Sequence, residues 1–302
     1  MNERRPAGER WVSAHLFHCG DLDALLLSTL AALREGGLAR PYFFLRYWEA
    51  GDHLRLRLAA ADGEEELIRR AVTRHCDRCF AGHPSYRADP AGYPERAWAL
   101  AVFERLDTYA GVLAPNDSVA FLPYRPEYER YGHGDAMRAV ERHFLESSRI
   151  AATMLAAAAD PGRRQTAAFT LLLLSRLAGA APPESRPPEQ NAAMRELIAR
   201  ARFAERYADQ SSRLVELDRR VTGFRPGAPQ TGIMAVWWWS LTALRDRQRA
   251  TGEVASDRIP IILDTCGHLL CNRLGLSLPE EAYIRFCADR MHESRPVPEG
   301  MP

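Results

Sequence analysis

Residues 42–58 read YFFLRYWEAGDHLRLRL, and this stretch decides the fold expected for the N-terminal part of the chain. An aromatic, strand-like run at 42–48 is followed by turn residues at 49–52 and by a run at 53–58 that alternates strictly between polar and apolar side chains. The pattern predicts a β-hairpin. On its second strand the leucines face one side, whereas His53, Arg55 and Arg57 face the other.

The residues around this hairpin predict an α+β fold. Strands are expected at 11–18 and 119–124, a helix from Asp21 to about Leu33, another at about 63–78, and a loop at 84–94. After about residue 135 only helices are expected, at 135–158, 162–178, 189–207, 210–222, 231–251, 257–274 and 279–293. We therefore expect a part with a small mixed or antiparallel sheet and helices (1–132), then a largely helical part (133–302), which together form one compact unit.

The composition excludes several kinds of chemistry. The sequence contains no lysine, so the 40 basic residues are all arginines, and Schiff-base or phosphate-binding lysines are excluded. A net charge of +1 argues against general binding to nucleic acids or anionic membranes. The polar N-terminus is not a signal peptide, and no apolar run is long enough to span a membrane. Six cysteines without a secretion signal indicate reduced thiols and a cytoplasmic protein.

The first candidate for chemistry is the arginine pair of the hairpin. Arg55 and Arg57 lie two residues apart on one strand, so both side chains project from the same face, beside His53. Two like charges at that spacing favour either a bound anion or a fully hydrated outer face. The pattern alone leaves both interpretations open.

Two further clusters stand later in the chain. In residues 124–132, YRPEYERYG, Glu127 and Arg130 are spaced to lie on one side of a helical turn, where a surface ion pair is the simpler interpretation. On an expected helix His268 and Asn272 are four residues apart, so a histidine suited to proton transfer lies beside an amide. Cys76 and Cys79 lack the partners of a metal site. We expect the tryptophans at 237–239 to serve packing or a domain interface, and a peptide-binding groove there stays open.

Together and in this order, the stretches FFLRYWEAGDHLRLR, YRPEYERYG and HLLCNRL resemble the thiopeptide-type bacteriocin biosynthesis family. This family comprises the glutamate-elimination domain of class I lantibiotic dehydratases and free-standing relatives. Its usual RYGG has His133 in place of the second glycine here, and an acidic residue usual near Ser147 and Ser148 is replaced. These departures affect substrate details more than the class of reaction.

The resemblance implies an enzyme that removes glutamate from glutamylated Ser or Thr side chains and leaves dehydroalanine or dehydrobutyrine. By this resemblance the catalytic residues are Arg55, Arg57, Glu127, Arg130 and His268. Residues expected to bind the substrate are His53, Tyr131, Asn272 and Arg273. The resemblance implies no metal and no organic cofactor.

The partners implied are a precursor peptide, with its leader and core, and a separate tRNA-dependent glutamylating protein. Direct contact with nucleic acid or membrane is not expected, and a homodimer is left open. Two alternatives remain. One is a pyridine synthase that joins two dehydroalanines by a formal [4+2] cycloaddition, and the other is a non-catalytic protein that binds the precursor peptide.

Overall fold

The computed structural model describes residues 10–104, 106–157, 160–180, 203–224 and 232–294. Contacts between Cα atoms divide the chain into an N-terminal unit, Met1–Pro126, and a C-terminal unit, Glu127–Pro302. The division falls a few residues before the boundary expected after residue 132. Each unit is described by itself.

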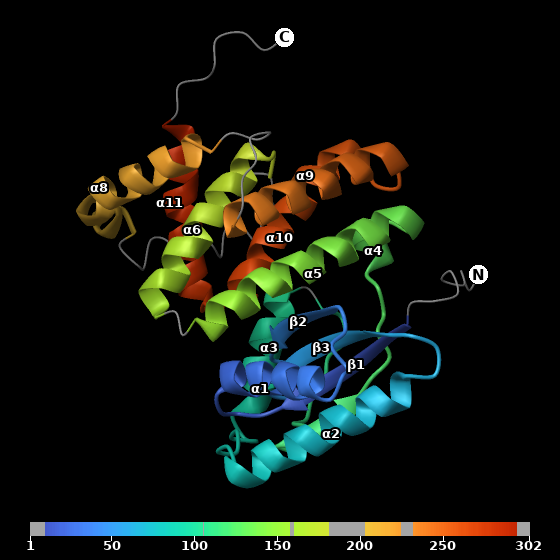
Figure 1. Cartoon of the computed structure of the whole chain (residues 1–302). Coiled ribbons are helices and arrows are strands. Elements are labelled where there is room, and N and C mark those ends of the chain that lie inside the picture. Colours follow the sequence, from blue (N-terminus) through green and yellow to red (C-terminus); the bar gives the residue numbers. More distant parts are fainter. Residues whose placement is uncertain (1–9, 105, 158–159, 181–202, 225–231, 295–302) are drawn as a thin grey trace. The chain divides into compact units, whose positions relative to one another are not determined.

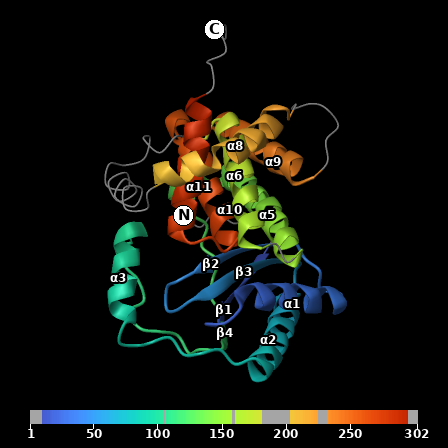
Figure 2. The ribbon, with the colours of Figure 1, turned by 90° about the vertical axis from the view of Figure 1, so that its left-hand side faces the viewer.

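The N-terminal unit contains a four-stranded antiparallel sheet with the strand order β2-β3-β1-β4 (Figures 1 and 2). The strands are β1 (Arg10–Phe17), β2 (Tyr42–Tyr47), β3 (His53–Ala60) and β4 (Ser118–Phe121). Helices α1 (Leu22–Glu35) and α2 (Glu65–Gly82) pack against each other and against the strands. This βαββαβ order is that of ferredoxin-like folds. The expected α+β class and the hairpin of β2 and β3 are confirmed.

The register of the sheet separates its two faces. Val12, Ala14 and Leu16 of β1 lie opposite Leu58, Leu56 and Leu54 of β3, and all six are almost completely buried. Their burial beside α1 and α2 supplies the hydrophobic driving force for this layer. Because side chains alternate along a strand, the residues between them project from the other face. That second face carries Ser13, His15 and Phe17, opposite Arg57, Arg55 and His53 respectively.

A helix that the sequence did not predict follows the loop after α2. Helix α3 spans Tyr93–Glu104, so the loop expected at 84–94 ends two residues earlier than its last proline suggested. Pro94 is the second residue of α3, where its missing N–H is not needed. Tyr93, Ala97 and Ala101 pack with Trp48 in a small apolar cluster, and Figure 2 shows α3 on the β2 side of the sheet.

In the residues that the structure describes, the C-terminal unit contains helices and their connecting loops but no strand. Its helices are α4 (Tyr128–Tyr131), α5 (Gly134–Ala156), α6 (Pro161–Leu177), α8 (Phe203–Thr222), α9 (Ile233–Thr251), α10 (Ile259–Arg273) and α11 (Leu278–Glu293), with a short 3-10 turn, Ser256–Arg258, before α10. Helices α5 and α9 pack together, as do α6 and α11.

Most helices expected for this unit are confirmed, with one difference. The break expected after residue 207 is absent, because α8 is continuous from Phe203 to Thr222. The rest of the helix expected at 189–207 lies outside the described residues. Among the residues described, no helix is long and apolar enough to cross a membrane.

Candidate functional site

Arg55 is held from two sides on the second face of the sheet. Its Nη2 donates a hydrogen bond of 2.9 Å to Oε2 of Glu49, and its guanidinium carbon lies 3.3 Å from the centroid of the Tyr47 ring. Oε1 of Glu49 in turn accepts a hydrogen bond of 3.1 Å from the backbone N–H of Ala110. Glu49 therefore fixes the guanidinium in one orientation, and sequence analysis did not single out this residue.

Arg57 lies among aromatic rings on the same face. Its guanidinium carbon is 5.6 Å from the ring centroid of Phe43 and 5.4 Å from that of Tyr124. Its Nη1 donates a hydrogen bond of 3.3 Å to the backbone carbonyl of Arg55. Packing against rings limits the positions that such a long side chain can take. Two oriented guanidiniums that keep their charge can bind carboxylates or stabilise an oxyanion.

His53 and His15 form a buried pair beside these arginines. Nδ1 of His53 lies 2.8 Å from the carbonyl oxygen of Gly51, and because a carbonyl only accepts, Nδ1 carries the proton. Nε2 of His53 then accepts a hydrogen bond of 3.1 Å from Nδ1 of His15. In this arrangement Nε2 of His15 is an unprotonated acceptor. His15 was not predicted, because only the sheet register places it opposite Arg55.

Burial keeps both imidazoles of this pair neutral. It lowers the pKa of His53 to about 4, with a contribution from the nearby Arg55 and Arg57. The pKa of His15 falls to about 3 for the same reason, with further contributions from His53 and the two arginines. Neutral rings leave the positive charge of this face on the guanidiniums.

In the C-terminal unit, Glu127 and Arg130 form the expected pair. Arg130 Nη1 lies 2.8 Å from Glu127 Oε2, and both side chains are more than half exposed. After them, Gly132 has φ +81°, and a Cβ there would lie 2.7 Å from Cβ of Glu253, so glycine is required. Nε2 of Gln248 donates to the carbonyl of Tyr131, which is buried. The buried Gln248 and the close approach of Glu253 to Gly132 thus fix the turn that carries Arg130.

His268 of α10 has a carboxylate partner on the next helix. Its Nδ1 lies 2.8 Å from Oε2 of Glu281 on α11. Burial alone would raise the pKa of Glu281, but the charges and hydrogen bonds of His268 and Arg285 outweigh it and lower the pKa to about 2. An ionised Glu281 accepts the Nδ1 proton and leaves Nε2 of His268 as the basic nitrogen. The His268 side chain is 40% exposed.

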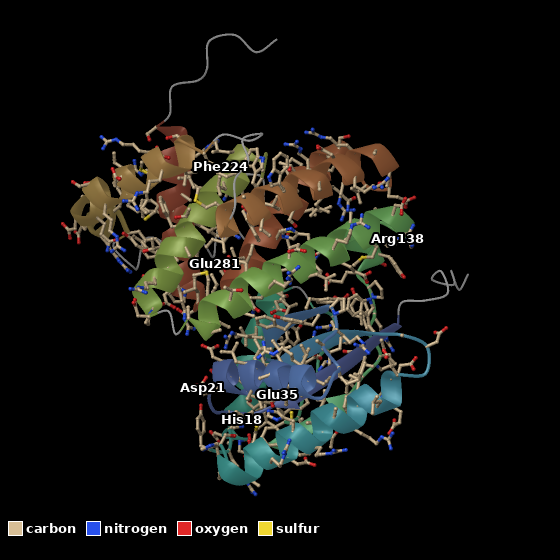
Figure 3. All side chains as sticks on the ribbon, in the orientation of Figure 1. His18, Asp21, Glu35, Arg138, Phe224 and Glu281 are labelled. Carbon is tan, nitrogen blue, oxygen red and sulfur yellow. The ribbon has the colours of Figure 1, made fainter. Side chains whose placement is uncertain are left out.

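A buried charge network continues from Glu281 (labelled in Figure 3) into the helical unit. Arg285 Nε donates to Glu281 at 2.6 Å, and its Nη1 donates to Asp264 at 2.6 Å. Arg176 of α6 pairs with the same Asp264 at 2.8 Å and with Asp289 at 2.7 Å. The residues of this network lie on α6, α10 and α11 and so join the three helices. Breaking one of these buried pairs would leave a charge without compensation.

The structure places the remaining expected substrate-binding residues as follows. Arg273 is fully buried, donates to Ser147 Oγ at 3.0 Å and lies 5.2 Å from the ring centroid of Phe144. Asn272 is partly exposed on α10, one turn after His268. Direct contact between substrate and Tyr131, Asn272 or Arg273 stays a prediction.

The site residues fall into two groups, one in each unit. The arginine pair and His53 meet on the sheet, whereas Glu127 and Arg130 share one turn and His268 lies on α10.

Two other sequence features have local explanations. Cys76 is buried, and Cys79 Sγ lies 3.1 Å from Nε2 of His75; among the described residues no group of three or more His, Cys, Asp or Glu could hold a metal ion. Trp237 is fully buried and donates its indole N–H to the Leu171 carbonyl at 2.9 Å, as a packing role requires, whereas Trp239 is half exposed.

The N-terminal unit is ferredoxin-like and carries a fixed arginine pair, and the helical unit that follows carries a His–Glu pair. Residues 11–292 match the model of the lantibiotic biosynthesis dehydratase C-terminal family, and the chain belongs to this family. No curated protein matches it.

Three solved structures have a similar fold. The pyridine synthase TbtD from thiomuracin biosynthesis has a TM-score of 0.75 and 21% identity, over 94% of this chain and 97% of that one. TsrL has a TM-score of 0.61 and 15% identity, over 94% and 95%. The tRNA-dependent lantibiotic dehydratase MibB from Microbispora sp. 107891 has a TM-score of 0.53 and 20% identity; the match covers 98% of this chain and 29% of MibB.

Proposed function

We propose that the chain is a free-standing elimination enzyme of ribosomal peptide natural-product biosynthesis. It removes glutamate from glutamylated Ser or Thr residues of a precursor peptide and leaves dehydroalanine or dehydrobutyrine. The observation that carries this proposal is the arginine pair of β3, in which Arg55 is fixed by Glu49 and Tyr47 and Arg57 lies beside the rings of Phe43 and Tyr124. Family membership supports it.

The reaction needs positive charge at two places. A base takes the α-proton of the glutamylated residue, its electron pair forms the Cα–Cβ double bond, and the Cβ–O bond breaks to release glutamate as a carboxylate. Negative charge builds on the peptide carbonyl oxygen and on the leaving oxygen. Arg55 and Arg57 stabilise these charges without losing their own protons.

The residues of the C-terminal unit supply the proton transfer in this proposal. Because Glu281 accepts the proton on Nδ1 of His268, Nε2 is the nitrogen that accepts or returns a proton. Glu127 orients Arg130, which adds a third guanidinium. Glu281 is a positioning residue, because it acts through His268. Tyr131, Asn272 and Arg273 complete the substrate-binding set as proposals.

The precursor peptide is the proposed substrate, and a separate protein attaches the glutamate. This chain matches 29% of the length of MibB, a tRNA-dependent lantibiotic dehydratase. We propose that a partner carries out the tRNA-dependent glutamylation and delivers the modified peptide to this chain.

The test is glutamate release from a glutamylated precursor peptide, followed by mass spectrometry. The wild-type chain is expected to convert the peptide to its dehydrated form, whereas Arg57→Ala and His268→Ala leave it glutamylated with unchanged thermal unfolding. Arg138→Ala, at a half-exposed arginine of α5 outside the proposed site, is the matched control and keeps full activity. If the wild-type chain releases no glutamate, the elimination proposal is wrong.

A second candidate is the [4+2] pyridine synthase, which is favoured by the match over nearly the full length of TbtD. A peptide that already contains two dehydroalanines separates the two proposals. Cyclisation of that peptide, without release of glutamate from the glutamylated one, would favour the synthase.

A further inference from the structure

Several buried polar atoms on the second face of the sheet have no hydrogen-bond partner among the described residues. They include Nε1 of Trp11, Oγ of Ser13 and Nε of Arg55. Ser13 is 2% exposed. Buried polar groups are nearly always hydrogen-bonded, so a cluster of unsatisfied donors indicates a missing partner.

These donors lie close together because of the strand register. Ser13 is the Cα partner of Arg57, and His15, two residues further along β1, is the partner of Arg55. Trp11 precedes Ser13 by two residues and projects from the same face, since its ring lies 4.8 Å from that of Phe43, over which Arg57 also packs. Side chains directly opposite in a sheet are about 5 Å apart at Cβ.

The chemistry of the missing partner follows from the donors. An indole N–H can only donate, a guanidinium can only donate, and a hydroxyl donates one proton. A carboxylate accepts several hydrogen bonds and donates none, and its charge complements Arg55 and Arg57. Leaving these donors unsatisfied costs folding free energy, which a binding site tolerates when the ligand restores the bonds.

We propose that Ser13 and Trp11 form, with Arg55 and Arg57, a carboxylate-binding subsite that holds the glutamate portion of the substrate. The subsite rests on the proposed function for the identity of that carboxylate, whereas the anion site itself follows from the donors. Ser13 and Trp11 are new members of the site, since neither carries a charge or a recognisable motif in the sequence.

The test measures binding of glutarate to the full chain by titration calorimetry and by the shift in thermal midpoint. Wild type is expected to bind. Ser13→Ala and Trp11→Phe are expected to weaken binding about tenfold or more, as loss of a hydrogen bond to a charged group does. Ser13→Thr keeps the hydroxyl and most of the affinity, and Ser212→Ala, at an exposed serine of α8, changes nothing.

Stability without ligand gives a second, independent measurement. If Ser13 Oγ has no partner, Ser13→Ala is expected to leave the thermal midpoint unchanged or to raise it, as removal of an unsatisfied buried hydroxyl does. No glutarate binding by wild type, unchanged affinity in both Ser13→Ala and Trp11→Phe, or a lower midpoint for ligand-free Ser13→Ala would each overturn the proposal. Glutarate binding without glutamate release from the peptide would refute the elimination function and leave the subsite standing.

Discussion

Replacement of Glu281 by glutamine tests the buried charge network that supports His268. Glu281 is 5% exposed and accepts hydrogen bonds from His268 and from Arg285. A fall in its pKa from 4.5 to about 2 corresponds to about 3 to 4 kcal/mol in favour of the ionised form, at about 1.4 kcal/mol per pH unit. We expect Glu281→Gln to lower the free energy of unfolding by about this amount at pH 7.

The pH dependence of the loss identifies its cause. A carboxyl group with a lowered pKa in the folded state stabilises the protein above its unfolded pKa, and this stabilisation disappears as the pH falls through the folded pKa. The stability difference between wild type and Glu281→Gln is therefore expected to be full at pH 7 and to shrink by more than half at pH 3.

Urea unfolding at a series of pH values from 7 to 3 measures this difference. Glu293→Gln is the matched control, because Glu293 is an exposed residue of the same helix, and a change of less than about 0.5 kcal/mol is expected. A stability difference that is equally large at pH 3 and pH 7, or absent at pH 7, would refute the electrostatic explanation. Glutamate release is expected to fall as well, because the neutral amide no longer holds the Nδ1 proton of His268 as strongly.

Two further predictions concern the backbone and the buried histidines. Gly132→Ala is expected to lower the free energy of unfolding by about 2 kcal/mol or more, because of the positive φ and the contact with Glu253. Gly252 also has a positive φ but has open space around it, so Gly252→Ala is expected to lower the free energy of unfolding by less. Equal losses in the two variants would contradict the steric explanation. His15→Gln is expected to reduce the loss of stability at acid pH, measured by urea unfolding. As the pH falls below 6.5, His15 binds a proton in the unfolded chain but not in the folded one, where its pKa is about 3, so wild type loses stability that the variant keeps. Parallel pH profiles for the two proteins would contradict this.

The local features of the fold could be predicted from the sequence. Alternation at 53–58 predicted the hairpin and the shared face of Arg55 and Arg57, and the helix expected from Asp21 begins there, with the Asp21 side chain as its N-cap. The prediction was wrong where one residue type occurs in two kinds of structure. Pro94 indicates a loop, yet it lies in the first turn of α3, where proline is tolerated.

The partners of the site residues could not be predicted in this way. Glu49 was recognised only as a turn residue, although it holds Arg55. His15 is separated from His53 by 38 residues, and the sheet register alone brings the two rings together. Glu281 lies on a different helix from His268, so its role depends on how α10 and α11 pack. Periodicity describes one element at a time and carries no information about such contacts.

The register of β3 restricts how this part of the chain can evolve. Its side chains alternate between the apolar core and the arginine face along all eight residues, His53–Ala60. Loss or gain of a single residue within the strand would exchange the two faces, turning guanidiniums into the core and leucines outward. Length changes must therefore be confined to the loops, and alignments of related chains should place no gap between residues 53 and 58.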